Sequence, residues 1–77
     1  MAVMEKKRKK STKKLPKLLY DCRVSHNLTQ REVAEVCGVT EQAVSQWEQG
    51  LWRPSPRNIP KLEELFETDL KTAYFLS

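Results

Sequence analysis

The sequence has few of the residues from which catalytic and metal sites are usually built. It contains one histidine, His26, and two cysteines, Cys22 and Cys37, which form no C-x-x-C pair. A zinc site takes about four ligands, so these separated residues do not predict one. Free cysteines on apolar faces are typical core residues, and a disulfide or metal site is the alternative. Neither a Ser–His–Asp set nor a phosphate-cradling glycine loop is evident, so we expect no catalysis and no cofactor.

Glycine is also scarce, and long apolar runs are missing. Only two glycines occur among the 77 residues, and no stretch alternates between apolar and polar side chains as a strand would. A hydrophobic content of 39% is enough for a modest core in one small domain. No apolar run is long enough for a membrane span, and the N-terminus MAVMEKKRKK lacks the apolar region of a secretory signal. These features favour an all-α fold in the cytoplasm.

The positive charge is concentrated at the N-terminus. The net charge is +4, yet residues 1–14 hold seven Lys/Arg and one acid, and residues 15–77 hold seven Lys/Arg and nine acids. The basic segment therefore carries +6 and the remainder −2. Such a block is expected to be disordered when free. It is either a solubilising tail or an arm that settles on the phosphates of a polyanion.

A first helix is predicted at residues 15–26. Leu15, Leu19 and Cys22 recur at helical spacing. Pro16 lies in the first turn, where its missing N–H is not needed. His26 lies at the other end, where a cation suits the helix dipole.

Two capped helices separated by a glycine form the clearest pattern. Thr29 and Glu32 form a capping box, in which each side chain can accept from the backbone N–H of the other residue. Gly38 occupies the position of a left-handed residue that ends a helix, and Thr40 is a typical N-cap for the next one. The other glycine closes that helix. The pattern predicts a helix-turn-helix at residues 30–49.

The second of these helices has two different faces. Val44 and Trp47 lie three positions apart and are expected to face inward. The outer face carries short or amide-bearing side chains, namely Thr40, Glu41, Gln42, Ser45 and Gln46. An ordinary αα-hairpin would explain the apolar spacing but usually carries a Glu/Lys surface. Amides can make bidentate contacts to a base edge, adenine in particular.

Two further helices are predicted after a proline-containing loop. Ile59, Leu62 and Phe66 share one face of the first, and Thr68 or Asp69 is expected to cap a short last helix.

The segment LTQREVAEVCGVTEQAVSQWEQG resembles the helix-turn-helix of the phage repressor and Cro family, also known as the Xre family. The resemblance extends over roughly residues 15–74, and RPSPRNIPKLEELFETDLKTAYF is similar to the two helices that follow in the family. It implies an all-α, five-helix lambda-repressor-like domain at residues 15–77, preceded by a disordered basic arm at residues 1–14. It also implies sequence-specific binding to double-stranded DNA, usually as a homodimer.

The resemblance further implies roles for individual residues. The positions that enter the major groove and contact bases are Thr40, Glu41, Gln42, Ser45 and Gln46. The phosphate-contacting candidates are Gln30, Arg31, Trp52, Arg53 and Arg57, with Lys9, Lys10, Lys13 and Lys14 in the arm. Arg23 and Glu48 match a partly buried structural salt bridge between the first and third helices.

Several residues leave two interpretations open. Glu41 is an acid where the family often has a neutral residue, so it either accepts from a cytosine amine or repels phosphate and caps its own helix. Trp52 either leans on a sugar–phosphate edge or covers the core. The apolar residues Tyr74, Phe75 and Leu76 form either an end that packs back on the domain or a two-fold interface, which the resemblance favours. It also favours the arm on DNA over the passive tail.

These expectations define a cytoplasmic transcriptional regulator, a repressor that binds a palindromic operator as a dimer, of phage or mobile-element origin. The alternative is an antitoxin or adaptor domain that acts mainly through a protein partner. The absence of an added segment beyond the five helices argues against that alternative.

Overall fold

The computed structural model describes residues 14–76, with side chains described to residue 75. This part of the chain contains five α-helices and no strand. The helices are α2 (Lys14–Ser25), α3 (Gln30–Cys37), α4 (Glu41–Gln49), α5 (Asn58–Phe66) and α6 (Lys71–Leu76). The all-α, five-helix prediction is confirmed. The first helix begins at Lys14, one residue earlier than expected, so that this lysine belongs to a helix.

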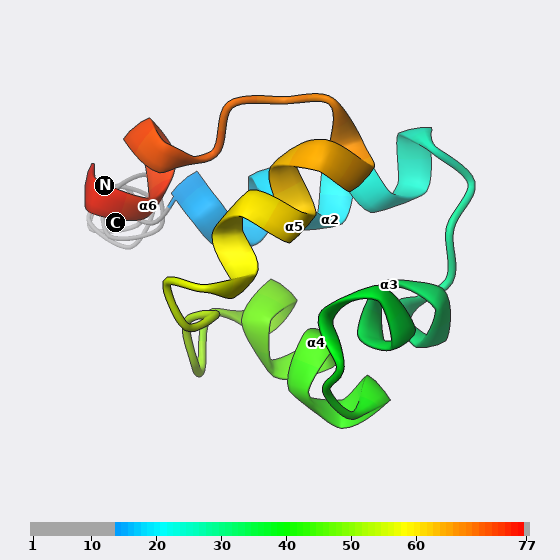
Figure 1. Ribbon diagram of the computed structural model, residues 1–77. Helices are drawn as coiled ribbons and strands as arrows, with labels where there is room; N and C mark the ends of the chain where they lie inside the picture. Colours follow the sequence, from blue (N-terminus) through cyan, green and yellow to red (C-terminus); the bar gives the residue numbers. More distant parts are fainter. Residues whose placement is uncertain (1–13, 77) are drawn as a thin grey trace, which may run out of the picture.

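The helices pack around one apolar core. α4 packs against both α3 and α2, while α5 contacts α3 and α6 contacts α2 (Figure 1). The buried apolar side chains that form the core are Leu15, Leu19, Cys22, Val33, Ala34, Cys37, Val44, Trp47, Ile59, Leu62, Phe66 and Leu70. Both cysteines are free thiols in this core, and burial raises their pKa values. Buried thiols of this kind act as packing side chains of the core and not as nucleophiles of a site.

The end of α2 is closed by local side-chain and backbone contacts. Nδ1 of His26 lies 2.8 Å from the carbonyl oxygen of Cys22, which accepts the hydrogen bond. The ring of His26 also lies 5.8 Å from that of Phe66, measured between centroids. Asn27 then adopts a positive φ of 58°, which reverses the chain toward α3.

The turn between α3 and α4 follows from its capping residues. Thr29 accepts from the backbone N–H of Glu32 at 3.0 Å, and the Glu32 carboxylate accepts from the N–H of Thr29 at 2.8 Å, which completes the capping box. Gly38 ends α3 in the left-handed region at φ 70°. The Thr40 hydroxyl accepts from the N–H of Ala43 at 3.1 Å and begins α4. These contacts set the angle at which α4 leaves α3.

The start of α6 is held from two directions. Asp69, one of the two predicted caps, accepts from the N–H of Lys71 at 3.0 Å, whereas the Thr68 hydroxyl donates to the carbonyl of Phe66. The carboxylate of Glu63 on α5 accepts from the N–H groups of Leu70 and Lys71 at 2.8 and 3.1 Å. The start of α6 is therefore tied to α5 by the Glu63 side chain, while α6 itself packs against α2.

Two negative observations apply to the described residues. None of the helices in residues 14–76 has the length and apolarity that crossing a bilayer requires. Within the same residues, no group of three His, Cys, Asp or Glu side chains is placed to hold a metal ion.

Candidate nucleic-acid interface

The inner face of α4 is fixed to the rest of the domain. Val44 and Trp47 are 2% and 6% exposed and lie in the core, as predicted for Trp47. Glu48, one residue further along, has a side chain that is only 7% exposed and faces α2. α4 is thus anchored along one side, which leaves the opposite side as a rigid platform.

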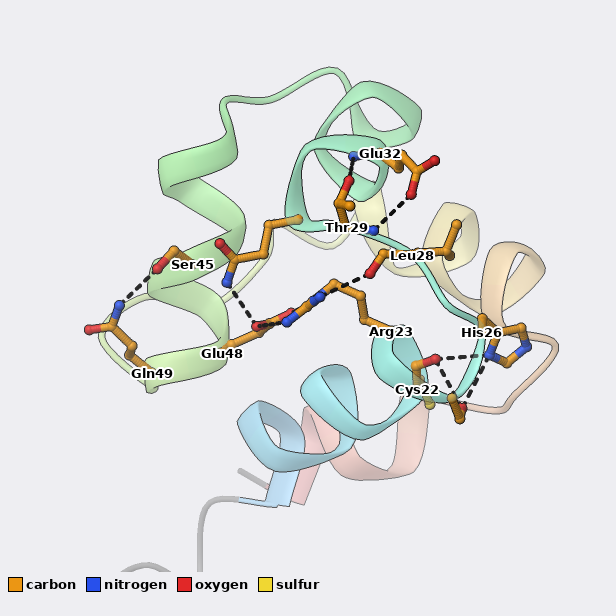
Figure 2. A network of polar contacts seen from close by, with 11 residues as sticks. Cys22, Arg23, His26, Leu28, Thr29, Glu32, Ser45, Glu48 and Gln49 are labelled. Atoms are coloured by element: carbon orange, nitrogen blue, oxygen red, sulfur yellow. Dashed lines mark hydrogen bonds and ion pairs between the residues drawn. The ribbon is translucent and has the colours of Figure 1, made fainter.

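The anchor at Glu48 is a charged network that joins three helices. Nε of Arg23 lies 2.6 Å from Oε2 of Glu48, and Nη2 lies 3.2 Å from Oε1, so the pair is bidentate (Figure 2). The Nη1 group of Arg23 also donates to the carbonyl of Leu28 at 2.9 Å. The side-chain amide of Gln30 donates to Oε1 of Glu48 at 3.0 Å. The expected salt bridge is present, and it also fixes the α2–α3 loop and the start of α3.

Hydrogen bonding to Glu48 raises the pKa of Arg23, and this effect outweighs the opposing effect of burial. The guanidinium carbon also lies 5.3 Å from the ring centroid of Tyr20 on the same helix. Bidentate pairing with a planar guanidinium adds directional constraint as well as attraction. The network therefore fixes the rotation of α4 about its own axis.

The outer face of α4 carries the five predicted base-contacting residues. Thr40, Glu41 and Gln42 are exposed, while Ser45 and Gln46 are partly exposed. The Thr40 hydroxyl caps α4, and Glu41 is the acidic residue in the first turn of that helix. Across residues 14–76, no hydrogen bond engages the side-chain amides of Gln42 or Gln46. The geometry brings these residues together on one accessible surface at the start and middle of α4.

Ser45 has a neighbour that the sequence pattern did not single out. The side-chain amide of Gln49 donates to the Ser45 hydroxyl at 2.8 Å (Figure 2). The two residues are four apart on one helix, a spacing at which side chains meet, so this spacing was the available signal. The bond orients the Ser45 hydroxyl and occupies one of its lone pairs.

The predicted phosphate-contacting residues fall into different environments. Arg57 and Trp52 are exposed, Trp52 by 65%, so its side chain does not cover the core. Arg31 makes only a loose pair with Glu35 at 3.8 Å, with both side chains largely exposed. Arg53 instead contacts α6, as described below. Lys14 is exposed at the start of α2, and Lys9, Lys10 and Lys13 lie outside the described residues.

The three predicted interface residues at the C-terminus do not behave alike. Tyr74 packs against the core and is partly buried. Phe75 is 77% exposed and meets the Tyr74 ring edge-on at a centroid distance of 5.5 Å. The side chain of Leu76 lies outside the described part. Phe75 is therefore the member of this set that presents an apolar ring to solvent.

Two capped helices joined by a tight glycine turn, with the second helix locked on its inner face and polar on its outer face, define a helix-turn-helix domain. Such domains place the second helix in the major groove of DNA. A family model for helix-turn-helix proteins matches residues 19–72. The chain belongs to this family, the Cro/C1-type or Xre-like helix-turn-helix proteins, which are DNA-binding transcription regulators. Searches of curated proteins and of solved structures gave no significant match.

Proposed function

We propose that the protein is a repressor that binds a roughly palindromic operator in double-stranded DNA as a homodimer. The observation that carries the proposal is the outer face of α4, where the Gln42 and Gln46 amides have no partner among residues 14–76 while the inner face is locked. An amide in this setting can pair with the N6/N7 edge of adenine. The locked inner face means that such pairing needs little further ordering of the protein.

The residues around α4 are suited to hold the phosphate backbone. Arg31 and Arg57 present donors on the exposed surface that flanks α4. Gln30 at the start of α3 is partly exposed, and one hydrogen of its amide already goes to Glu48, which leaves the second hydrogen for a phosphate. We assign to them, and to Trp52, the sugar–phosphate contacts that set register and affinity. The basic arm adds charge that is independent of sequence. Thr40, Glu41 and Ser45 complete the base-contacting set.

The dimer is supported by the exposed apolar surface near the C-terminus. Phe75 is 77% exposed and lies beside the partly buried Tyr74 ring, so a partner copy that packs there would cover both rings. A two-fold dimer places two copies of α4 in successive major grooves, about 34 Å apart, which requires an operator with matching half-sites.

The decisive experiment is the selection of bound duplexes from a random pool, followed by footprinting of the winners. We expect two related half-sites whose centres are separated by about one helical turn. Purified protein that shows no preference among duplexes would refute the proposal. A tightly bound second protein that co-purifies in place of a self-associated dimer would support the antitoxin or adaptor alternative.

A further inference from the structure

Arg53 and Tyr74 lie 21 residues apart in the sequence, yet they join the α4–α5 loop to α6. Nη2 of Arg53 donates to the backbone carbonyl of Tyr74. The guanidinium carbon of Arg53 also lies 4.1 Å from the centroid of the Tyr74 ring. One planar group is thus used twice, by its edge toward the carbonyl and by its face toward the ring. A lysine ammonium cannot reproduce this combination.

We call the two contacts between Arg53 and Tyr74 the joint. The residues on both sides of the joint are anchored elsewhere in the domain. The backbone N–H of Tyr74 donates to the carbonyl of Leu70 at 2.9 Å, and Leu70 is fully buried. The N–H groups of Leu70 and Lys71 are both held by the Glu63 carboxylate, so α6 offers a fixed support. On the other side, the N–H groups of Leu51 and Trp52 both point to the carbonyl of Gln46 on α4, at 3.0 and 3.4 Å. The joint therefore links α6 to the α4–α5 loop, which is itself hydrogen-bonded to α4. In Figure 1, α6 and this loop lie on the same side of the domain.

We infer that Arg53 is a positioning residue, which acts through Tyr74 to fix the loop at residues 51–57 for DNA. The inference rests on the proposed function. It changes the role expected for Arg53 from contacting a phosphate to holding the loop in place. The groups that it positions are Trp52, beside it in the loop, and Arg57, at the start of α5. α6 lies away from the outer face of α4, yet it sets the affinity for DNA because it holds the loop in the bound conformation. Preorganisation of this kind lowers the ordering cost of binding.

The first test uses the full chain without DNA. Hydrogen exchange of the Leu51 and Trp52 amides is measured by NMR in Arg53→Lys, in Tyr74→Leu and in the double variant. An exposed cation–π pair corresponds to about a two- to fivefold change in an equilibrium, so we expect each variant to accelerate exchange by about that factor. The double variant should exchange no faster than Arg53→Lys alone, because Tyr74→Leu removes only the ring contact, which the arginine change already loses. Unchanged exchange in both single variants would overturn the inference.

Three control variants separate the joint from other effects. Tyr74→Phe keeps the ring and the carbonyl, so it should exchange like the original chain. Arg57→Lys changes a loop arginine that has no side-chain partner among the described residues, and it should leave the exchange of Leu51 and Trp52 unaltered. Phe75→Ser removes the exposed ring that meets the Tyr74 ring edge-on and leaves both Arg53 contacts in place, so it reports the loss of that ring together with any effect of dimerisation. Acceleration in all three controls would also overturn the inference.

The second test measures affinity for the selected duplex, with the dimer dissociation constant determined for each variant. We expect Tyr74→Leu and Arg53→Lys each to weaken binding about two- to fivefold, and the double variant to bind no more weakly than Arg53→Lys alone, because both changes remove the same ring contact. Losses that add would show that Arg53 acts through its own phosphate contact, and the inference would fall. If exchange responds as expected while the original chain prefers no duplex, the joint stands and the proposed function fails.

Discussion

The side-chain amide of Gln30, the first residue of α3, donates to the carboxylate of Glu48 in the last turn of α4, at 3.0 Å. The same carboxylate receives the guanidinium of Arg23 from α2. Glu48 therefore connects Gln30, to which we assign a phosphate contact, with α4, to which we assign the base contacts. Rigid placement of a phosphate contact relative to the reading helix is what converts backbone binding into a defined register.

Loss of the Glu48 charge is expected to destabilise the fold strongly. Arg23 and Glu48 are only 14% and 7% exposed in their side chains, so Glu48→Gln leaves a partly buried guanidinium without its counter-ion. We expect a loss of about 3 kcal/mol in the free energy of unfolding, measured by urea denaturation. The matched control is Asp21→Asn, which breaks the ion pair between Asp21 and Lys17. The two side chains of this pair are 52% and 78% exposed, respectively. That change should cost about 0.5 kcal/mol or less, and equal losses in the two variants would contradict the prediction.

Gly38→Ala should destabilise the protein through its backbone alone. Gly38 has φ 70°, and a Cβ built at this position meets no atom within 4 Å. The expected loss is about 1–2 kcal/mol, since an alanine is forced into the left-handed region without any clash. Gly38→Asn should lose less in the same denaturation assay, because asparagine tolerates that region. An asparagine variant that is less stable than the alanine variant would point to crowding instead.

Glu63 should make part of the stability depend on pH in the acid range. The hydrogen bond from the N–H of Leu70, followed by that from the Lys71 side chain, lowers the pKa of Glu63 from its ordinary value of 4.5. A carboxyl group with a lowered folded-state pKa stabilises the fold above its unfolded-state value, and this contribution is lost as the pH falls through the folded-state value. Glu63→Gln should therefore be less stable at neutral pH, and the difference should shrink as the pH falls below 4.5.

The control for Glu63 is its neighbour in sequence. Glu64 is exposed and makes no ion pair or hydrogen bond among the described residues, so Glu64→Gln should follow the original chain across the whole range. Urea denaturation at a series of pH values measures both differences. A Glu63→Gln difference that does not vary with pH would show that the carboxylate acts through shape alone.

Gln42→Ala should weaken binding to the selected operator by about 1–3 kcal/mol, because a bidentate amide–adenine contact is lost. Binding to random duplexes should change little, since the backbone contacts are retained. Both affinities are measured by titration at one fixed salt concentration. Equal losses on the two kinds of duplex would remove Gln42 from the base-reading set.

Deletion of residues 1–13 should flatten the dependence of DNA affinity on salt. The deletion removes six of the seven basic residues in the N-terminal segment and leaves α2 whole from Lys14. The slope of log affinity against log salt should fall by roughly 0.9 for each phosphate contact that is lost. A slope that stays the same would show that the arm is a passive tail.

Much of the fold was predictable because its signals are local. The capping box at Thr29 and Glu32, the cap at Thr40 and the left-handed Gly38 all act within four residues along the chain, so the sequence itself displays each partner. The inward position of Trp47 follows from helical spacing in the same way. The limits of the two central helices could therefore be predicted nearly to the residue.

The contacts that the sequence did not reveal connect distant segments. Glu63 reaches the start of α6, and Arg53 reaches Tyr74, only because the chain brings α6 back against α2. No spacing rule marks these pairs, since their separation depends on the path of two loops. From the sequence, an arginine in this loop suggests a phosphate contact. Only the structure shows that Arg53 contacts Tyr74 on α6 instead.

Cys22 and Cys37 are placed so that their alkylation can report the opening of the domain. Their side chains are 8% and 4% exposed and come from α2 and α3, so a thiol-specific reagent reaches either sulfur only when the helices separate. The rate of alkylation then reports how often the domain opens, with no label introduced. Operator DNA, if it binds only the closed form, should slow alkylation of both sulfurs by the same factor.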